Sequence, residues 1–143
     1  MITEQQRGIT KMELFEMLEL IDKSDDPVKT VKDLGSRYSS FTDYLRCVFD
    51  EKIQFLLPDG KPPYHPAKTP ASSWHKKHLD LGYWVKGLKG EQVNPIRREK
   101  MFLDMLEAVH AEDALILVDM ISKKTPSKKL TREVVEEAIP NLF

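Results

Sequence analysis

One segment of the sequence decides the architecture of this chain, Phe55-Leu56-Leu57-Pro58-Asp59-Gly60-Lys61-Pro62-Pro63-Tyr64-His65-Pro66. Proline fixes φ and lacks a backbone N–H group, so these residues cannot form a helix or a central strand. Pro58 with Asp59-Gly60 predicts a turn, and the later prolines predict an extended backbone. The large apolar side chains predict that this proline segment, taken as residues 55–70, is ordered against the rest of the protein.

Helix signals stand on both sides of the proline segment. Thr10 with Glu13 forms the pattern of a capping box, and Asn94-Pro95 is typical of a helix start. A helix from about residue 111 is apolar on nearly every side, which predicts a central position, and Thr131 caps a last helix.

These signals predict an all-α fold. We expect a compact single domain over residues 1–143, with six or seven helices and the proline segment crossing the helical body. The N-terminal helices lie in residues 1–54, the proline segment in 55–70 and the C-terminal helices in 71–143.

One apolar stripe follows the proline segment and predicts a continuous helix. Its members step by four, three, four and three residues: Trp74, His78, Leu81, Val85 and Leu88. Since His78 lies within the stripe, we interpret it as a hydrogen-bonded core histidine and not as a metal ligand.

Composition limits the class of protein. The formal net charge of −1 creates no field that draws the whole molecule to nucleic acid or membrane. No apolar run approaches the roughly 20 residues that a membrane helix needs, and the start of the chain lacks the pattern of a signal peptide. The single cysteine, Cys47, excludes an internal disulfide and fits a reducing compartment.

Residues 61–100 carry nine Lys and Arg against three Asp and Glu, which predicts a basic face. Cations can contact phosphates and an aromatic ring can stack on a base. The nucleic-acid candidates are Lys76, Lys77, Tyr83, Lys86, Lys89, Arg97, Arg98 and Lys100. The alternative is that these charges are scattered around two helices as solvated groups.

No pattern of a catalytic site is present in the sequence. Phosphate-binding glycine loops, nucleophile elbows and paired cysteine ligands are absent. His65, His75 and His78 are close enough in sequence to suggest zinc, but spacing alone is weak evidence. We therefore predict a non-enzymatic protein with no catalytic residue, no cofactor and no metal ion.

Several short patterns in the second two-thirds of the chain occur together. They are Leu-Leu-Pro-x-Gly-x-Pro-Pro-Tyr-x-Pro at 56–66, Arg97-Arg98-Glu99 before Phe102, Glu112-Asp113-Ala114, Lys123-Lys124, and the ending from Leu130 to Leu142. With these patterns the chain resembles an uncharacterised family of small proteins from large contractile-tailed phages, cyanophages included. The resemblance implies a phage accessory protein in the cytoplasm of the infected host cell, and it assigns no catalytic residue.

Our leading functional hypothesis is a protein that binds host or phage machinery through protein–protein contacts; a nucleic-acid-binding accessory protein of phage replication or transcription is the alternative. The partner-binding candidates are Pro62, Pro63, Tyr64, Leu142 and Phe143. Tyr64 either faces a partner or packs inward as a brace, and the apolar terminus docks on the protein's own core or on a partner. The oligomeric state stays open.

Overall fold

Nine helical elements follow one another in the computed structural model, which describes residues 11–143. Seven are α-helices, and η1 and η2 are 3₁₀-helices. Their bounds are α2 (Leu14–Lys23), α3 (Pro27–Arg37), α4 (Ser39–Phe49), α5 (Trp74–Lys77), η1 (His78–Trp84), η2 (Lys89–Gln92), α6 (Pro95–Ala108), α7 (Ala111–Ile121) and α8 (Arg132–Ala138). No strand forms within residues 11–143, and one isolated antiparallel bridge joins Phe55 to Val85. The predicted all-α fold in a single compact domain is confirmed.

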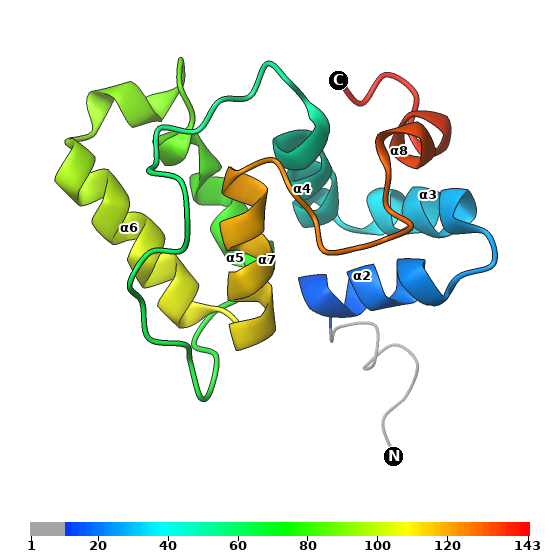
Figure 1. Ribbon diagram of the computed structural model, residues 1–143, viewed down its shortest axis with the longest axis horizontal. Coiled ribbons are helices and arrows are strands. Elements are labelled where there is room, and N and C mark those ends of the chain that lie inside the picture. Colours follow the sequence, from blue (N-terminus) through cyan, green and yellow to red (C-terminus); the bar gives the residue numbers. More distant parts are fainter. Residues whose placement is uncertain (1–10) are drawn as a thin grey trace.

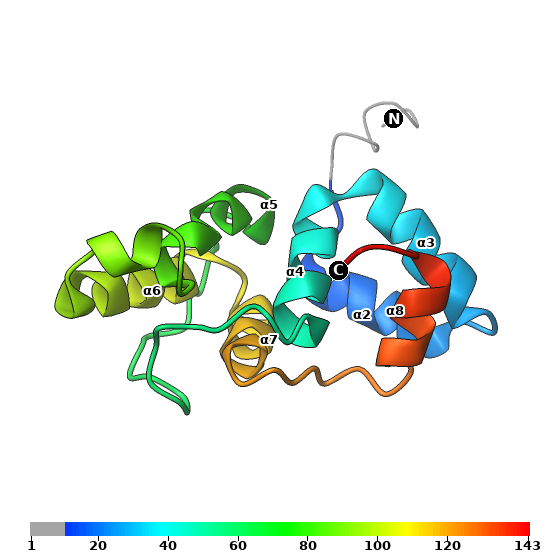
Figure 2. The same ribbon diagram turned by 90° about the horizontal axis from the view of Figure 1, so that it is seen from above.

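The helices form two groups, with α7 between them (Figure 1 and Figure 2). Helices α2, α3, α4 and α8 gather on one side, whereas η1, η2 and α6 lie on the other. Helix α7 contacts α2, α4 and α6, which gives it the central position that its apolar sequence predicts. One hydrophobic core runs through both groups.

The first described helix begins later than the sequence predicts. Thr10, the predicted N-cap, lies outside the described residues, and α2 begins at Leu14 with Glu13 before it. The Glu16 carboxylate accepts the backbone N–H of Glu13 at 2.9 Å. Side chains three residues apart thus stabilise the start of the helix, as in a capping box.

The predicted continuous helix after the proline segment is wrong. Helix α5 ends after one turn, and η1 continues with three residues per turn, so that His78, Leu81 and Trp84 share one face. At Val85 the backbone is extended, because the bridge to Phe55 holds it there. Leu88 consequently lies outside the core and is 57% exposed.

The proline segment is attached at its entrance by backbone hydrogen bonds. The Leu56 N–H donates to the Trp84 carbonyl at 2.7 Å, and the Lys86 N–H donates to the Gln54 carbonyl at 2.8 Å. These two bonds form around the bridge between Phe55 and Val85. The sequence contains no strand that could pair with residues 53–55, but this short contact satisfies the Gln54 carbonyl and the Leu56 N–H.

Arg98 of α6 links three irregular segments of backbone. Its guanidinium donates to the carbonyls of Leu56 at 2.8 Å, Gly90 at 2.7 Å and Val93 at 3.1 Å. In addition, the indole N–H of Trp84 donates to the Arg98 carbonyl at 3.2 Å. One side chain therefore fixes the proline segment and the loops around η2 on the first turns of α6.

Beyond Arg98 the proline segment follows α6 toward its C-terminal end. Gly60 turns the chain with φ of +92°, a conformation that favours glycine. The His65 backbone N–H then donates to the Glu107 carboxylate at 2.6 Å. The segment runs beside a helix of the body, as Figure 1 shows, so the predicted crossing is confirmed.

Helices α3 and α8 approach each other closely at Gly35. A Cβ atom at this position would lie 2.6 Å from Cδ1 of Ile139. The sequence suggests that Gly35 ends the second helix, but α3 continues to Arg37. Gly35 is needed for packing against α8 and does not terminate the helix.

The first prediction concerns the Arg98 contacts. Arg98→Ala should lower the free energy of unfolding by about 1.5–3 kcal/mol, because three carbonyls lose a charged donor. Arg97→Ala is the matched control: Arg97 is exposed one residue earlier, and its loss should cost less than about 0.5 kcal/mol. Urea unfolding of both variants measures the difference. Equal stabilities would show that Arg98 does not hold these segments.

Candidate functional site

A groove lies between α2, α7 and the loop that follows α7. Its volume is about 710 Å³, and it is partly open to solvent. Gly60 and Lys61 of the proline segment also line it. Its apolar lining residues are Phe15, Leu18, Leu115, Ile116, Val118 and Pro126. Three segments that are distant in sequence, namely α2, the proline segment and α7 with its following loop, thus form one concave apolar surface.

The composition of α7 explains the apolar floor of the groove. Its apolar side chains point in nearly all directions, and α2, α4 and α6 cover only part of its surface. Leu115 stays 51% exposed, and Val118 is partly buried. The exposed Leu115 side chain thus lies beside the partly buried Val118 on the floor of the groove.

Acidic side chains outnumber basic ones around the groove. The acidic residues are Glu19, Asp22, Glu112 and Asp119, against Lys61 and Lys124. The Asp22 carboxylate is fixed in place: it accepts the Ser127 hydroxyl at 2.6 Å and the backbone N–H of Lys129 at 3.0 Å. Because these bonds hold the loop after α7 against α2, that wall of the groove is held in one position.

Asp113 joins the two helices that form the groove. Its fully buried carboxylate, in the first turn of α7, accepts the backbone N–H of Phe15 at 2.7 Å and that of Leu14 at 3.2 Å. Burial raises the pKa of this carboxyl to about 7; the N–H groups of Phe15 and Leu14 lower it, and Glu13 raises it further. The first turn of α2 is thereby anchored to α7.

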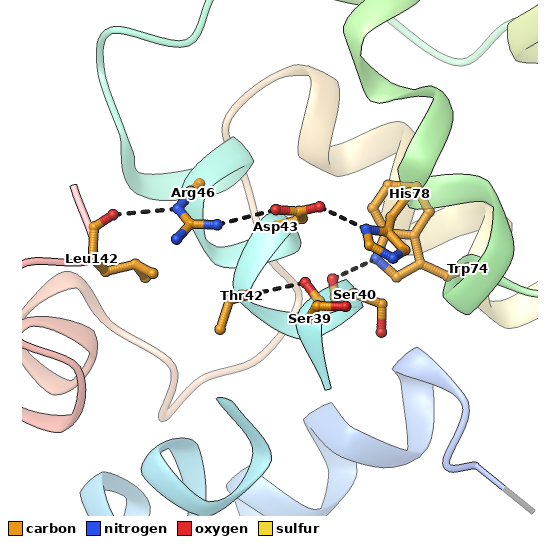
Figure 3. Close-up of polar contacts among 8 residues, drawn as sticks. All are labelled: Ser39, Ser40, Thr42, Asp43, Arg46, Trp74, His78 and Leu142. Carbon is orange, nitrogen blue, oxygen red and sulfur yellow. Dashed lines mark hydrogen bonds and ion pairs between the residues drawn. The ribbon is translucent and has the colours of Figure 1, made fainter. Parts of the chain in front are cut away.

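A polar network surrounds α4 on the other side of α7 (Figure 3). The Asp43 carboxylate accepts the His78 Nδ1–H at 2.6 Å and pairs with Arg46 at 3.1 Å. Arg46 also donates to the Leu142 carbonyl at 3.3 Å, and the Trp74 indole N–H donates to the Ser40 carbonyl at 2.8 Å. The prediction of a hydrogen-bonded core histidine at position 78 is confirmed.

Ser40 and His75 have the separation of a nucleophile and a base. The His75 Nε2–H donates to the Met12 carbonyl at 2.6 Å, so Nδ1 accepts the Ser40 hydroxyl at 2.7 Å. Burial lowers the pKa of His75, which favours this neutral form. Ser40 is only 1% exposed, however, and a substrate has no access to its hydroxyl. This pair links α2, α4 and α5.

Cys47, like Ser40, has a side chain that can act as a nucleophile but is buried. Burial raises the pKa of its thiol to about 12, and the nearby Lys123 ammonium lowers it only in part. A thiolate is the reactive form of cysteine, so this thiol is inert at neutral pH. Cys47 packs within the core.

The partner-binding candidates have different surroundings. Pro62 and Pro63 line a cavity of about 270 Å³ between the proline segment and α6. Tyr64 packs inward, and its side chain is 8% exposed. Of the two alternatives that the sequence left open, this position corresponds to the brace and not to a residue that faces a partner. Its ring is therefore not a contact surface in this conformation, since its neighbours in the core cover it.

The apolar terminus docks on the protein's own helices. Leu142 and Phe143 are partly buried and pack against the core. The Arg132 guanidinium lies over the Phe143 ring at 4.9 Å. Together with the bond from Arg46, these contacts attach the terminus to α4 and α8.

The basic residues of 61–100 do not form one uniform surface. Arg98 is engaged by backbone carbonyls, and Lys100 pairs with Asp104 at 3.1 Å. Tyr83 and Arg97 line a common cavity, and the Lys89 ammonium lies 5.2 Å from the centre of the Tyr83 ring. The remaining candidates, Lys76, Lys77 and Lys86, lie on α5 and after η1.

Histidine and carboxylate side chains do not converge as metal ligands. Within residues 11–143, no group of three or more His, Cys, Asp or Glu side chains could hold a metal ion. His75 and His78 bond to different partners, and His65 uses its backbone to contact Glu107. In the same part of the chain, no helix is both long and apolar enough for a membrane span.

Sequence reasoning did not identify the groove. Its residues come from α2, the proline segment, α7 and the following loop, so no local pattern contains them. One feature of the sequence could have indicated the groove, namely the apolar surface of α7. This surface is larger than the area that the three neighbouring helices cover.

Comparison with known proteins gives one family. A family model described as "Family of unknown function (DUF6433)" matches residues 15–127. No curated protein and no solved structure shows significant similarity to the chain. The matched range includes all of α2 except Leu14, the proline segment and α7, and hence every lining residue of the groove.

The second prediction separates bracing by Tyr64 from recognition. Tyr64→Ala should lower the free energy of unfolding by about 1–3 kcal/mol, because a buried ring is removed from the core. Tyr64→Phe keeps the ring and is the control, with stability close to that of the unchanged protein. Chemical unfolding measures both, and an equally stable Tyr64→Ala variant would contradict the bracing role.

The third prediction concerns Asp113 and pH. Because its pKa is raised to about 7 in the folded protein from 3.8, the folded state binds more protons between these values. Its contribution to stability should therefore be complete below about pH 4 and be lost as pH rises to about 7, with a slope of up to about 1.4 kcal/mol per pH unit.

Asp113→Asn removes this titration and supplies the comparison. His75 contributes the opposite slope, because its pKa is lowered on folding, so the difference between the two proteins isolates Asp113. Urea unfolding across pH 4 to 8 measures that difference. A constant difference over the whole range would contradict the raised pKa.

Proposed function

Since the chain belongs to the family of unknown function DUF6433, we propose its role from its surface: it is a non-enzymatic phage accessory protein that binds a protein partner in the groove between α2 and α7. The observation that carries the proposal is the groove itself, which combines an apolar floor with an acidic rim.

The shape of the groove favours a helical segment of the partner. Helices α2 and α7 supply most of its lining residues and it is partly open to solvent, which suits an amphipathic helix that places one apolar face in a hydrophobic groove. A small ligand is usually enclosed over most of its surface, and an open groove does not provide this.

The rim specifies the charge of that segment. Four carboxylates against two ammonium groups favour Lys and Arg beside the apolar face of the partner. Exposed carboxylates such as Glu19 and Glu112 would contribute more to the association rate and to specificity than to affinity. We therefore propose a basic amphipathic helix as the occupant.

The place of action rests on the resemblance to proteins of large contractile-tailed phages. A phage origin places the protein in the cytoplasm of the infected host cell, where the partner is a host or a phage protein. The reducing compartment fits its single buried cysteine.

The fourth prediction is the effect of a charge in the groove. Leu115→Lys places an ammonium group on the apolar floor and should weaken partner binding at least tenfold, a loss expected for a central interface residue. Leu79→Lys is the matched control: Leu79 is 74% exposed in η1 and does not line the groove. Both variants should unfold at the same urea concentration as the unchanged protein.

Selection of peptides displayed on phage particles identifies the occupant without a known partner. Peptides retained by the unchanged protein and by Leu79→Lys, but not by Leu115→Lys, should carry apolar residues at helical spacing together with Lys and Arg. Titration of a synthetic copy into all three proteins then gives the affinities. Binding that Leu115→Lys leaves intact, or selected peptides that are acidic, would refute the proposal.

A further inference from the structure

A second cavity lies where η1 and the residues around η2 meet the start of α6. These elements are at the end of the molecule opposite α3 and α8 (Figure 1 and Figure 2). The volume of the cavity is about 280 Å³. The residues that line it are Tyr83, Gln92, Val93, Asn94, Arg97 and Met101. It shares no lining residue with the groove between α2 and α7.

An aromatic ring lines the cavity, and a cation lies over one face of that ring. Tyr83 is partly buried and packs against the core, and it still lines the cavity. The aliphatic part of Lys89 lies over Gly82, where an added Cβ would meet it at 3.8 Å. The Lys89 ammonium lies over the Tyr83 ring, 5.2 Å from its centre, although Lys89 itself is not a lining residue.

The remaining polar groups can recognise a flat, anionic ligand. Asn94 Oδ1 accepts the Ile96 N–H at 2.8 Å, which fixes the side chain and leaves its NH₂ group as a donor. Arg97 is exposed on α6. Within residues 11–143, neither Lys89 nor Arg97 forms an ion pair, whereas Lys100 nearby is paired with Asp104.

We propose that this cavity binds one base of a single-stranded nucleic acid. The base lies against Tyr83, the side-chain amides of Gln92 and Asn94 contact its edge, and the flanking phosphates lie beside Lys89 and Arg97. An aromatic ring with neighbouring cations is the combination by which proteins bind single strands without strict sequence preference.

The geometry favours a single strand over a duplex. In a duplex each base face is covered by its stacked neighbours, so a ring that lines a cavity cannot reach it, whereas cations can contact phosphates of either form. The proposal is independent of the groove between α2 and α7, since the two sites have different residues. Loss of one activity by a variant therefore leaves the other measurable.

Fluorescence anisotropy with a short labelled single-stranded DNA, the same sequence as RNA, and the matching duplex tests the proposal at about 50 mM salt. Tyr83→Ala should weaken single-strand binding by about fivefold to 150-fold, the range measured for loss of one stacked base, whereas Tyr83→Phe should bind normally. Arg97→Gln and Lys89→Gln should each weaken binding and reduce the slope of log affinity against log salt by about 0.7.

Lys32→Gln is the charge-matched control, because Lys32 is exposed on α3 and distant from the cavity. Leu115→Lys should also bind nucleic acid normally, which separates this site from the groove. Should Tyr83→Ala fail to fold, as judged by its unfolding transition, the exposed positions Arg97 and Lys89 decide the question. The double variant Arg97→Gln/Lys89→Gln should then bind the single strand at least tenfold more weakly than Lys32→Gln.

Four results would overturn the proposal. The first is that the unchanged protein binds none of the probes. The second is that Arg97→Gln/Lys89→Gln and Lys32→Gln bind the single strand equally. The third is that the duplex is bound as tightly as the single strand, which would assign the cavity to phosphate contacts alone. The fourth is that a free mononucleotide binds as tightly as the oligonucleotide, which would assign the cavity to a small nucleotide.

Discussion

Helix α7 carries apolar side chains on almost its whole circumference, and covering them is the constraint on which the rest of the structure depends. Apolar surface left in water costs roughly 25 cal/mol per Å², so the other helices pack around it. Helices α2, α4 and α6 contact α7 and bury Leu117 and Met120 completely. Three helices cannot enclose a fourth, and the uncovered side of α7 becomes the floor of the groove.

Polar side chains fix the position of the segments between helices, which apolar packing alone does not determine. Asp113 anchors the start of α2, Arg98 binds three carbonyls of irregular backbone, and Asp43 connects His78 with Arg46 and hence with the C-terminal residues. Each acts where a buried backbone or ring N–H or C=O group would otherwise lack a partner. These polar contacts therefore complete a fold that apolar packing alone would leave mobile at the segments between helices.

A net charge close to zero conceals two surfaces of opposite character. The groove has an acidic rim around apolar side chains, whereas the cavity at the start of α6 is lined by Arg97 and by Tyr83, over whose ring the Lys89 ammonium lies. The two lie on different helices and can be occupied together. Occupation of both sites, as proposed above, would join a protein partner to a single strand.

The sequence alone predicted the local features of the chain. These are the turn at Gly60, the helix start at Asn94-Pro95, the apolar surface of α7 and the core histidine at position 78, and each follows from residues that are adjacent in sequence or one helical turn apart. The sequence did not predict that the 74–88 stripe breaks into α5 and η1, because the bridge between Phe55 and Val85 joins residues that are thirty positions apart. The inward position of Tyr64 and the engagement of Arg98 also required the packed structure. The groove could not be located beforehand, since helical periodicity reports which side of a helix is apolar but not which neighbouring helix leaves that side uncovered. Tyr83, Lys89 and Arg97 were among the basic and aromatic candidates of residues 61–100, but only the packed structure shows that these three lie together.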